Sequence, residues 1–404
     1  MGTKRSRSRK TDPSVPPGPS AEAGGLRRLL GYFLWLGTFG FGGPIATVGY
    51  MQRDLVEHRK WVTEPEFLNG VALGQTMPGP LAAQVVMWVG YLRAGAVGAL
   101  ATAGAFIVPS FAAVLAVAVF YVRSQGLDWV QSIFYGVAPG VMAIIAIAAV
   151  KLARLTNRTD LRLWAISAVT LTVTAVTGAE IALLFVGAGL VMLLWDAPPR
   201  FLRRPRGGAN ALLMAGTPGP GVLLGAAGGG TLVALALFFL KAGAFIFGSG
   251  LAIVPFLREG VVQQHHWLTE RQFLDAVAIG LITPGPVVIT ATFIGYLVGG
   301  LAGAGVATVA IFLPIYLGVV VPGRWFVRHR EDARLQAFVK GATAAAAGAI
   351  AGATIVLTRK AIVDLRTGAI AVGSLVLLLA LRRFRFKEPL VVVLSGLAGL
   401  LLAP

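Results

Sequence analysis

Long stretches without a charged residue constrain this chain more than any other feature of its sequence. Only 13% of the 404 residues are charged, whereas a soluble globular chain usually carries about a quarter. A spanning helix needs roughly 20 apolar residues, so these stretches have room for a dozen or so spans. They are residues 29–52, 67–92, 94–122, 209–240, 276–323, 341–358, 367–381 and 389–404. The sequence therefore predicts an all-α polytopic membrane protein embedded in a lipid bilayer.

The formal charge of +18 raises the alternative of a nucleic-acid-binding protein. The arginines and lysines, however, lie mostly in short loops between the apolar stretches. This distribution is typical of membrane proteins, whose cytoplasmic loops are rich in basic residues. We therefore expect no nucleic-acid partner.

The reactive side chains do not indicate an enzyme. The chain has no cysteine, which excludes a disulfide framework, a thiol nucleophile and a thiolate metal site. The four histidines all lie in polar loops: His58, His265, His266 and His329. We expect no metal, no cofactor and no catalytic residue, and we regard a membrane enzyme as the weakest of the functional hypotheses.

Residues 1–26 combine basic residues with proline, serine and glycine, a composition typical of disordered segments. A secretory signal peptide is the alternative. The apolar stretch that follows Arg28 is longer than a signal-peptide core, and no small-residue cleavage site ends it. We expect a disordered basic tail in the cytoplasm, followed by a retained first span.

The chain matches itself at an offset of 206 residues. The pattern Trp-x-Thr-Glu-x-x-Phe-Leu occurs at 61–68 and again at 267–274, and Pro-Gly-Pro occurs at 78–80 and at 284–286. Chance similarity between apolar sequences does not explain matches between polar residues in a fixed register. We expect a first transmembrane repeat at 27–196, a linker at 197–230 and a second repeat at 231–404.

The loop charges favour an inverted arrangement of the two repeats. If both repeats have the same orientation, lysine and arginine are spread almost evenly over the two sides of the membrane. If residues 209–229 form one extra span, the second repeat is inverted and most basic residues fall on the cytoplasmic side, as the positive-inside rule requires. The segment is rich in glycine and proline, so an apolar loop remains the alternative to an extra span.

Two glycine- and proline-rich interruptions recur in each repeat. Residues 39–44, Phe-Gly-Phe-Gly-Gly-Pro, correspond to 245–250, and residues 75–80, ending in Pro-Gly-Pro, correspond to 281–286. Prolines remove backbone donors and break helices. A break inside a membrane is tolerated only where the backbone is buried in protein or lines a cavity. Helices that restart at Pro80 and Pro286 would direct N–H groups at the middle of the membrane, where an anion is the natural ligand.

A simple kink or loop is the alternative for any single Pro-Gly-Pro sequence. The linker provides a control, because Pro-Gly-Pro at 218–220 lacks the flanking pattern. The tripeptide alone is therefore weak evidence. Its recurrence in register with an earlier glycine-rich break favours a functional role.

Lys241 is unusual because it lies about ten residues into an apolar stretch, roughly 15 Å from its start. A charge at that depth usually marks a substrate or ion path, although a lysine can also extend its ammonium group to the membrane surface. Its counterpart is Trp35, so we expect the two repeats to differ at the binding site.

The residues around the breaks have mainly structural interpretations. Thr63 with Glu66, and Thr269 with Gln272, have the spacing of capping boxes, and the preceding Trp61 and Trp267 are typical of interface anchors. The carboxylates nearest to the spans are expected to be electrostatic caps at helix starts. These carboxylates are Asp275, which pairs with Asn69 in the repeat, and Glu180, which pairs with Glu388.

Taken together, the motifs resemble those of the chromate ion transporter family over almost the whole chain after the tail. The matching segments are Phe41-Gly42-Gly43-Pro44, Gly74-Gln75-Thr76-Met77-Pro78-Gly79-Pro80, Phe247-Gly248-Ser249-Gly250 and Thr283-Pro284-Gly285-Pro286. The chain departs from the family pattern at Trp35 and Thr47, where many first-half relatives have a basic residue and a histidine, and at Ser249, which replaces a glycine.

The resemblance implies a secondary active transporter that exports chromate across the inner membrane and draws on the proton-motive force. A site of backbone amides and hydroxyl groups suits a tetrahedral dianion with many acceptor oxygens. A permease for sulfate or another oxyanion and a passive anion channel are the alternatives, and a homodimer is left open. The candidate substrate-binding residues are Gly42, Gly43, Pro44, Gln75, Thr76, Pro78, Gly79, Pro80, Gln84, Lys241, Gly248, Ser249, Gly250, Thr283, Pro284, Gly285 and Pro286.

Overall fold

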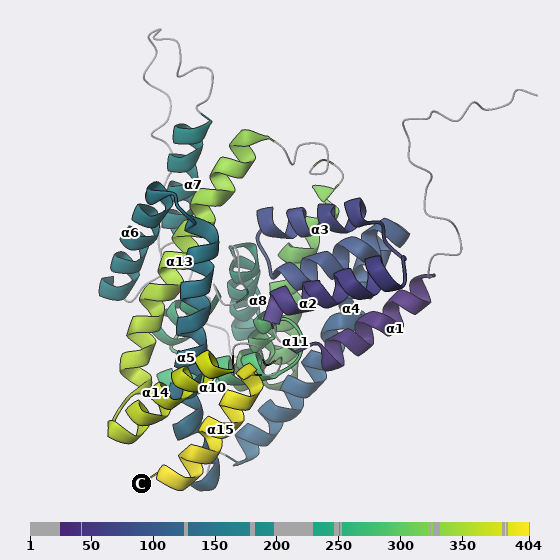
Figure 1. The fold of residues 1–404 in the computed structure, drawn as a ribbon. Coiled ribbons are helices and arrows are strands. Elements are labelled where there is room, and N and C mark those ends of the chain that lie inside the picture. Colours follow the sequence, from purple (N-terminus) through teal and green to yellow (C-terminus); the bar gives the residue numbers. More distant parts are fainter. Residues whose placement is uncertain are drawn as a thin grey trace, which may run out of the picture.

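The computed structural model shows a helical protein (Figure 1). It describes residues 25–41, 43–124, 128–177, 182–197, 229–245, 250, 253–323, 325, 332–381, 384 and 387–403. Every regular element among these residues is a helix, as predicted. The predicted tail disorder and the linking span at 209–229 fall outside the described residues.

The helices form two sets of equivalent elements. The first repeat contains α1 (Leu26–Phe39), α2 (Gly43–Met51), η1 (Gln52–His58), α3 (Glu64–Thr76), α4 (Leu81–Ser124), α5 (Asp128–Asn157), α6 (Leu161–Thr177) and α7 (Ala182–Asp196). The second contains α8 (Gly229–Ala244), α9 (Ile253–Arg258), η4 (Glu259–Gln264), α10 (Glu270–Ile282), η5 (Val287–Ile289), α11 (Thr290–Val320), α13 (Ala333–Ala361), α14 (Leu365–Ala380) and α15 (Lys387–Leu402).

The two repeats share even their irregular backbone conformations. The turn inside α4 has φ −143° and ψ 30° at Ala94, followed by φ 59° and ψ −146° at Gly95. The turn inside α11 has φ −139° and ψ 24° at Gly299, followed by φ 59° and ψ −148° at Gly300. Each repeat also has a π-helical turn at the same place, η1 or η4. The repeat that the sequence predicts is therefore confirmed in the backbone.

Four of the described helices, α4, α5, α11 with its preceding turn η5, and α13, are long and apolar enough to cross a membrane. The 30 residues of α5 extend about 45 Å at 1.5 Å per residue, which exceeds a hydrocarbon core of roughly 30 Å. The 17 residues of α6 extend only about 25 Å. The described part of the chain therefore has fewer helices of full span length than the dozen or so spans for which the sequence has room.

The shorter helices turn back on themselves as hairpins. In α3 and the first part of α4, Trp88 Nε1 donates a hydrogen bond to the Glu66 carbonyl at 2.9 Å, and this contact joins the open ends of the two arms. Arg162 Nη1 donates to Asp196 Oδ1 at 2.7 Å between the ends of α6 and α7. Hydropathy measures the length of an apolar stretch but not a reversal within it, which is why the span estimate was too high.

The hairpin of α14 and α15 and the reversal within α4 are held by hydroxyl groups. The Oγ atoms of Ser374 and Ser395 lie 2.9 Å apart between α14 and α15. Thr102 Oγ1 donates to the Val86 carbonyl at 3.1 Å, so residues 96–124 run back along residues 81–93. In the first repeat, Tyr32 Oη on α1 donates to Asp54 Oδ2 on η1 at 3.3 Å.

The equivalent helices α5 and α13 pack against each other in opposite directions. Near the start of α5, Tyr135 Oη donates to Asp364, which directly follows α13. At the end of α5, Asn157 Nδ2 donates to Ser167 Oγ at 2.9 Å, and Ser167 Oγ donates to the Ala344 carbonyl in the first half of α13. Because both helices are long enough to span the membrane, the two repeats are inverted.

The repeats are also interlocked. Helix α13 packs mainly on α6 and α7, whereas α5 packs on α14 and α15 (Figure 1). Glycines at equivalent positions permit this close packing. A Cβ added at Gly136 would stand 2.0 Å from the Ser395 carbonyl oxygen, and one added at Gly341 would stand 2.2 Å from the Ala188 carbonyl oxygen.

Candidate substrate-binding site

Both Pro-Gly-Pro sequences form the tips of helical hairpins, which confirms the predicted breaks. Helix α3 ends at Thr76 and α4 begins at Leu81, with Gly79 at φ +142° in the turn. Helix α10 ends at Ile282, and the chain turns through Gly285 at φ +106° before the short 3₁₀ turn η5. The positive φ angles explain why glycine stands between the two prolines. The capping boxes that start α3 and α10 are also confirmed.

Each Pro-Gly-Pro turn packs against a long helix of the other repeat. A Cβ added at Gly285 would stand 2.1 Å from Ser110 Oγ on α4, and one added at Gly79 would stand 3.0 Å from Ile315 Cγ2 on α11. The glycine-rich break of the second repeat lies close by, because a Cβ at Gly250 would stand 3.8 Å from Pro80 Cβ. Backbone breaks from both repeats therefore meet in one region of the protein.

Gln84 supports the first turn from within the protein. Its side chain is fully buried, and Nε2 donates to the carbonyl oxygens of Pro78 at 2.9 Å and Met77 at 3.2 Å. Its Oε1 atom is buried, and no described residue forms a hydrogen bond with it. Gln84 thus fixes the orientation of the carbonyl groups in the turn.

The two threonines at the helix ends use their hydroxyl protons within their own helices. Thr76 Oγ1 donates to the Ala72 carbonyl at 2.8 Å, and Thr283 Oγ1 donates to the Ile279 carbonyl at 2.6 Å. Each hydroxyl group would need to rotate away from its carbonyl before it could donate to an anion.

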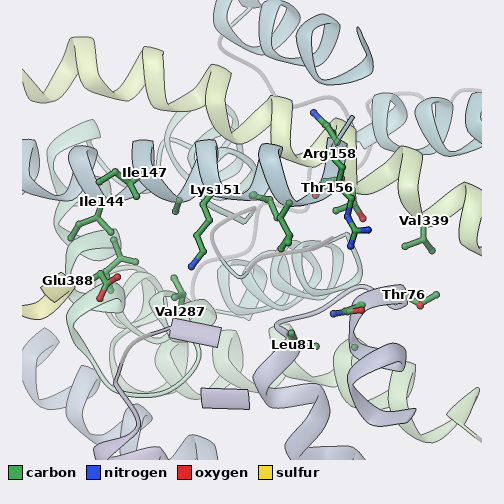
Figure 2. Close-up of a pocket in the computed structure, with 18 of the residues that line it drawn as sticks. Thr76, Leu81, Ile144, Ile147, Lys151, Thr156, Arg158, Val287, Val339 and Glu388 are labelled. Carbon is green, nitrogen blue, oxygen red and sulfur yellow. The ribbon is translucent and has the colours of Figure 1, made fainter. Parts of the chain in front are cut away.

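A cavity of about 1080 Å³ reaches these turns (Figure 2). Four of the candidate residues line it: Gln75, Thr76, Thr283 and Gly285. Gly40 and Phe41 at the first break also line it, as do residues along α5 and α13. The cavity therefore brings together elements of both repeats.

The charged residues of the cavity were not identified from the sequence. Four are basic, namely Lys151, Arg158, Lys340 and Lys387, and two are acidic, Asp160 and Glu388. Figure 2 shows the Lys151 side chain extending from α5 into the cavity, with Val287 of the second repeat on the other side. From the sequence alone, lysine and arginine at the ends of apolar stretches are expected in loops. Their positions in the sequence therefore indicate a charged surface and do not indicate a cavity.

The acidic groups of the cavity are already engaged, whereas two of the lysines are not. Asp160 forms an ion pair with Arg162 at 2.8 Å, and Glu388 lies 3.9 Å from Lys387 Nζ. Within the described part of the chain, Lys151 and Lys340 have neither an ion pair nor a hydrogen bond. Two ammonium groups are thus available to an anion in this space.

The cavity is asymmetric with respect to the repeat. The counterpart of Lys151 is Val356, and the counterpart of Lys340 is Tyr135. The cavity therefore has a basic lining on one side of the protein, and the equivalent positions of the other repeat provide no cation. The sequence predicted a difference between the repeats at Lys241 and Trp35. The cavity differs between the repeats at Lys151 and Lys340 instead.

The structure places Lys241 away from the cavity. Its Nζ lies 5.8 Å from the centre of the Phe256 ring, and its side chain is exposed. Burial and the charge of Lys241 lower the pKa of the nearby His265. Lys241 therefore belongs to a cluster at the end of the α8–η4 hairpin, and its position does not support a role in the cavity.

The remaining candidates lie behind the cavity lining or outside the described residues. Pro78, Gly79, Pro80, Pro284 and Pro286 form the turns themselves. Gly43 and Pro44 begin α2, and Gly250 lies next to the first turn. Gly42, Gly248 and Ser249 lie outside the described residues.

An inverted pair of helical repeats, with broken hairpins that meet at a cavity, has the architecture of a secondary transporter. The comparisons with known proteins define the class further. The family model described as "Chromate transporter" matches residues 27–193 and 233–400, one match for each repeat. The chain belongs to the chromate transporter family.

Individual relatives agree with this assignment. The chain is 49% identical over 379 residues to a chromate transport protein of Cupriavidus metallidurans, covering 94% of each chain. It is 30% identical to a chromate transport protein of Pseudomonas aeruginosa, covering 98% of this chain and 95% of the relative. An uncharacterized transporter of Bacillus subtilis is 30% identical over 183 residues, which are 99% of that protein and 43% of this chain. That relative has the length of a single repeat. No solved structure matches the chain.

Proposed function

We propose that the protein exports chromate from the cytoplasm and draws on the proton-motive force. The observation that carries the proposal is the cavity at the two Pro-Gly-Pro turns, which contains the unpaired ammonium groups of Lys151 and Lys340. The names of the relatives supply the identity of the anion. Transfer of a dianion into a membrane is very costly unless its charge is compensated, and two ammonium groups match its charge.

In this proposal Lys151 and Lys340 attract and neutralise the anion, and the turns determine how it is bound. Gln75 is exposed to the cavity and provides an amide donor. Thr76 and Thr283, with backbone N–H groups near Gly79 and Gly285, are candidates to complete the hydrogen bonds to the oxyanion. Tetrahedral oxyanions accept several charge-assisted hydrogen bonds, so a set of converging donors favours them over a monovalent halide.

The distribution of charge supports a cytoplasmic opening of the cavity. Its rim includes Arg158 at the end of α5 and Gln336 at the start of α13. The N-terminal end of α1 lies on the same side. Tyr32 near the start of α1 donates a hydrogen bond to Asp54 on η1, and η1 leads into the start of α3. This side is rich in basic residues: Arg27, Arg28, Arg53, Arg59, Lys60, Arg93, Arg154, Arg158, Arg162 and Arg334. Among the described residues the opposite side has fewer, namely Arg123, Lys241, Arg258, Arg271, Arg359, Lys360 and Arg366. The positive-inside rule then assigns the first side to the cytoplasm.

Transport by alternating access follows from this arrangement. In this proposal the cavity opens to the cytoplasm, and movement of one repeat relative to the other would close that side and open the opposite one. The Pro-Gly-Pro turns contact the long helices of the opposite repeat, so such a movement changes the surroundings of the bound anion directly.

Chromate uptake by inverted inner-membrane vesicles tests the proposal. We expect wild-type vesicles to accumulate chromate, and Lys151→Ala and Lys340→Ala each to reduce the initial rate at least tenfold. Arg154→Ala is the matched control, because Arg154 lies on α5 one turn from Lys151 but does not line the cavity. Unchanged uptake in both lysine variants would contradict the assigned site, and a loss in Lys241→Ala instead would restore the residue favoured by the sequence.

The same vesicles distinguish the alternatives. A sulfate permease would transport sulfate in preference to chromate. A passive channel would equilibrate chromate without accumulation, and its flux would not respond to an imposed proton gradient.

A further inference from the structure

A buried carboxyl group lies in the protein at a distance from the cavity. Asp275 on α10 is 2% exposed, and its Oδ2 accepts a hydrogen bond from Tyr121 Oη on α4 at 2.7 Å. Its Oδ1 is buried and has no hydrogen-bond partner among the residues that the structure describes. The sequence favoured an electrostatic cap at a helix start for this residue. That expectation is wrong, because α10 begins at Glu270 and Asp275 lies in its second turn.

The surroundings of this pair are aromatic. The Tyr121 ring contacts Phe134 on α5 and Phe293 on α11, each with a distance of 5.2 Å between ring centres. An ionised carboxylate in such an environment is strongly destabilised unless an ion pair or several hydrogen bonds compensate it. Asp275 has one hydrogen bond and, within the described residues, no ion pair.

The neighbouring charged groups have other partners. On α10 itself, Arg271 Nη2 donates to the Gln131 carbonyl on α5 at 3.0 Å. Arg258 on α9 pairs with Glu270 through Nε at 3.0 Å from Oε2. Two further titratable groups at this end are bonded elsewhere: Tyr135 on α5 to Asp364, and Glu259 on η4 to Gln264. The side chains of Arg123 on α4, Asp128 on α5, and Arg359 and Lys360 on α13 are exposed. Arg271 is therefore the cation whose field reaches Asp275, and it does not contact the carboxyl group.

The Asp275–Tyr121 contact joins the two repeats at the end opposite to the cavity opening. Tyr121 lies in the last turn of α4, and Asp275 lies in the second turn of α10. The cavity touches α10 only from Gly280 onward. The counterparts of the pair are Asn69 and Phe326, so the repeat contains an acid–phenol pair only once. Movement of one repeat relative to the other that opened this end would separate the contact.

We propose that Asp275 is a proton-binding site, neutral while the repeats are closed around it and ionised once this end opens to water. Closure then takes up a proton from the solvent at this end, and opening releases it to the same solvent, so the step sets the pH dependence of the transition without carrying a proton across the membrane. Within the proposed export cycle, on which this second step rests, proton binding at Asp275 favours the return of the empty protein to the state whose cavity faces the cytoplasm.

Infrared spectroscopy of the protein reconstituted in lipid tests the protonation state without measuring transport. The difference spectrum between wild type and Asp275→Asn at neutral pH should contain the carbonyl band of a protonated carboxylic acid. Asp160→Asn is the matched control and should not remove this band, because Asp160 is paired with Arg162. Tyr121→Phe retains the acid and removes its hydrogen bond, so its band should move to higher frequency. Loss of a carboxylate band in Asp275→Asn, or no shift in Tyr121→Phe, would overturn the proposal.

Chromate flux in proteoliposomes tests this pH dependence. Net efflux requires the empty protein to return, whereas chromate–chromate exchange does not. We expect net efflux by the wild type to depend on pH at the outer face, and Asp275→Asn to abolish that dependence while exchange remains within about twofold. If net efflux by the variant still depended on pH, or if the variant lost chromate–chromate exchange, the assignment would be overturned. If the wild type transported no chromate, the export proposal would fail, but the infrared result on Asp275 would still stand.

Discussion

Ser110 Oγ on α4 donates a hydrogen bond of 2.6 Å to the carbonyl oxygen of Pro284, in the Pro-Gly-Pro turn of the other repeat. The equivalent position on α11 is Ile315, which only packs against the first turn at Gly79. One hairpin tip is therefore fixed to the opposite repeat by a directional bond, and the other is held by apolar contact. Because only one hairpin tip has this hydrogen bond, the contacts between the repeats would differ between the state open to one side of the membrane and the state open to the other.

Removal of this bond should destabilise the protein by about 0.5–1.5 kcal/mol, because Ser110→Ala takes the donor away from a partly buried carbonyl group. We expect a lower midpoint of thermal unfolding in detergent and a reduced rate of chromate uptake. Ile315→Val is the control, since it removes the δ methyl group of the residue at the equivalent position and no hydrogen bond. Equal stability of Ser110→Ala and wild type would show that the bond is not formed in the membrane.

Gly285→Ala should be far more damaging than most glycine substitutions. The added Cβ would stand 2.1 Å from Ser110 Oγ, and φ at Gly285 is +106°, a value that residues with a side chain rarely adopt. Such backbone strain costs about 1–3 kcal/mol even without the steric overlap. We expect a loss of uptake of more than tenfold, measured at equal amounts of protein in the membrane.

Gly104→Ala is the matched control for this prediction. Gly104 lies inside α4, and a Cβ added there would meet no atom within 4 Å. Alanine is favoured over glycine inside a helix by about 1 kcal/mol, so this variant should be as stable as the wild type or more stable. Similar effects of the two substitutions would contradict a special role of the turn.

The sequence predicted the helical class, the repeat, the inversion and the position of the breaks. These features depend on local chemistry, because Pro-Gly-Pro prevents helical hydrogen bonding wherever it occurs and the register between the repeats is visible in the residues. The capping boxes at Thr63 and Thr269 were correct for the same reason, since a cap involves residues only three positions apart.

The cavity could not be predicted because it depends on contacts between distant segments. Lys151 and Lys340 are 189 positions apart, and both lie in sequence at the edge of an apolar stretch, like many loop residues. Only the antiparallel packing of α5 and α13 places them around one space. Lys241 shows the opposite error, because its depth in an apolar stretch indicated a buried charge, whereas the hairpin of α8 leaves its side chain exposed.

Acidification should destabilise the protein through His265. Burial and the Lys241 ammonium lower the pKa of this histidine in the folded state, whereas an unfolded histidine titrates near about 6.5. The unfolded state therefore binds the proton more readily, and the stabilisation present above this pH is lost as the pH falls below it. His265→Phe retains an aromatic ring against Trp267, which stacks on His265 at 4.2 Å, and should reduce the pH dependence of the unfolding midpoint.

Lys241→Met should weaken the same dependence, because removal of the positive charge raises the pKa of His265 toward its usual range. Thermal unfolding in detergent, measured above and below a pH of about 6.5, provides the test for both variants. If His265→Phe unfolded with the pH dependence of the wild type, another group would be responsible.

The inversion of the repeats predicts that equivalent residues react from opposite sides of the membrane. Leu161 at the start of α6 and Leu365 at the start of α14 have equivalent places, and they are 81% and 89% exposed. The chain has no cysteine, so Leu161→Cys and Leu365→Cys each introduce a single thiol into a protein without background reactivity. A membrane-impermeant maleimide added to intact cells should label Leu365→Cys, and in inverted vesicles it should label Leu161→Cys. Labelling of both variants from one side would contradict the inversion. If Leu161→Cys were labelled in intact cells and Leu365→Cys in inverted vesicles, the inversion would hold but the proposed orientation of the cavity would be reversed.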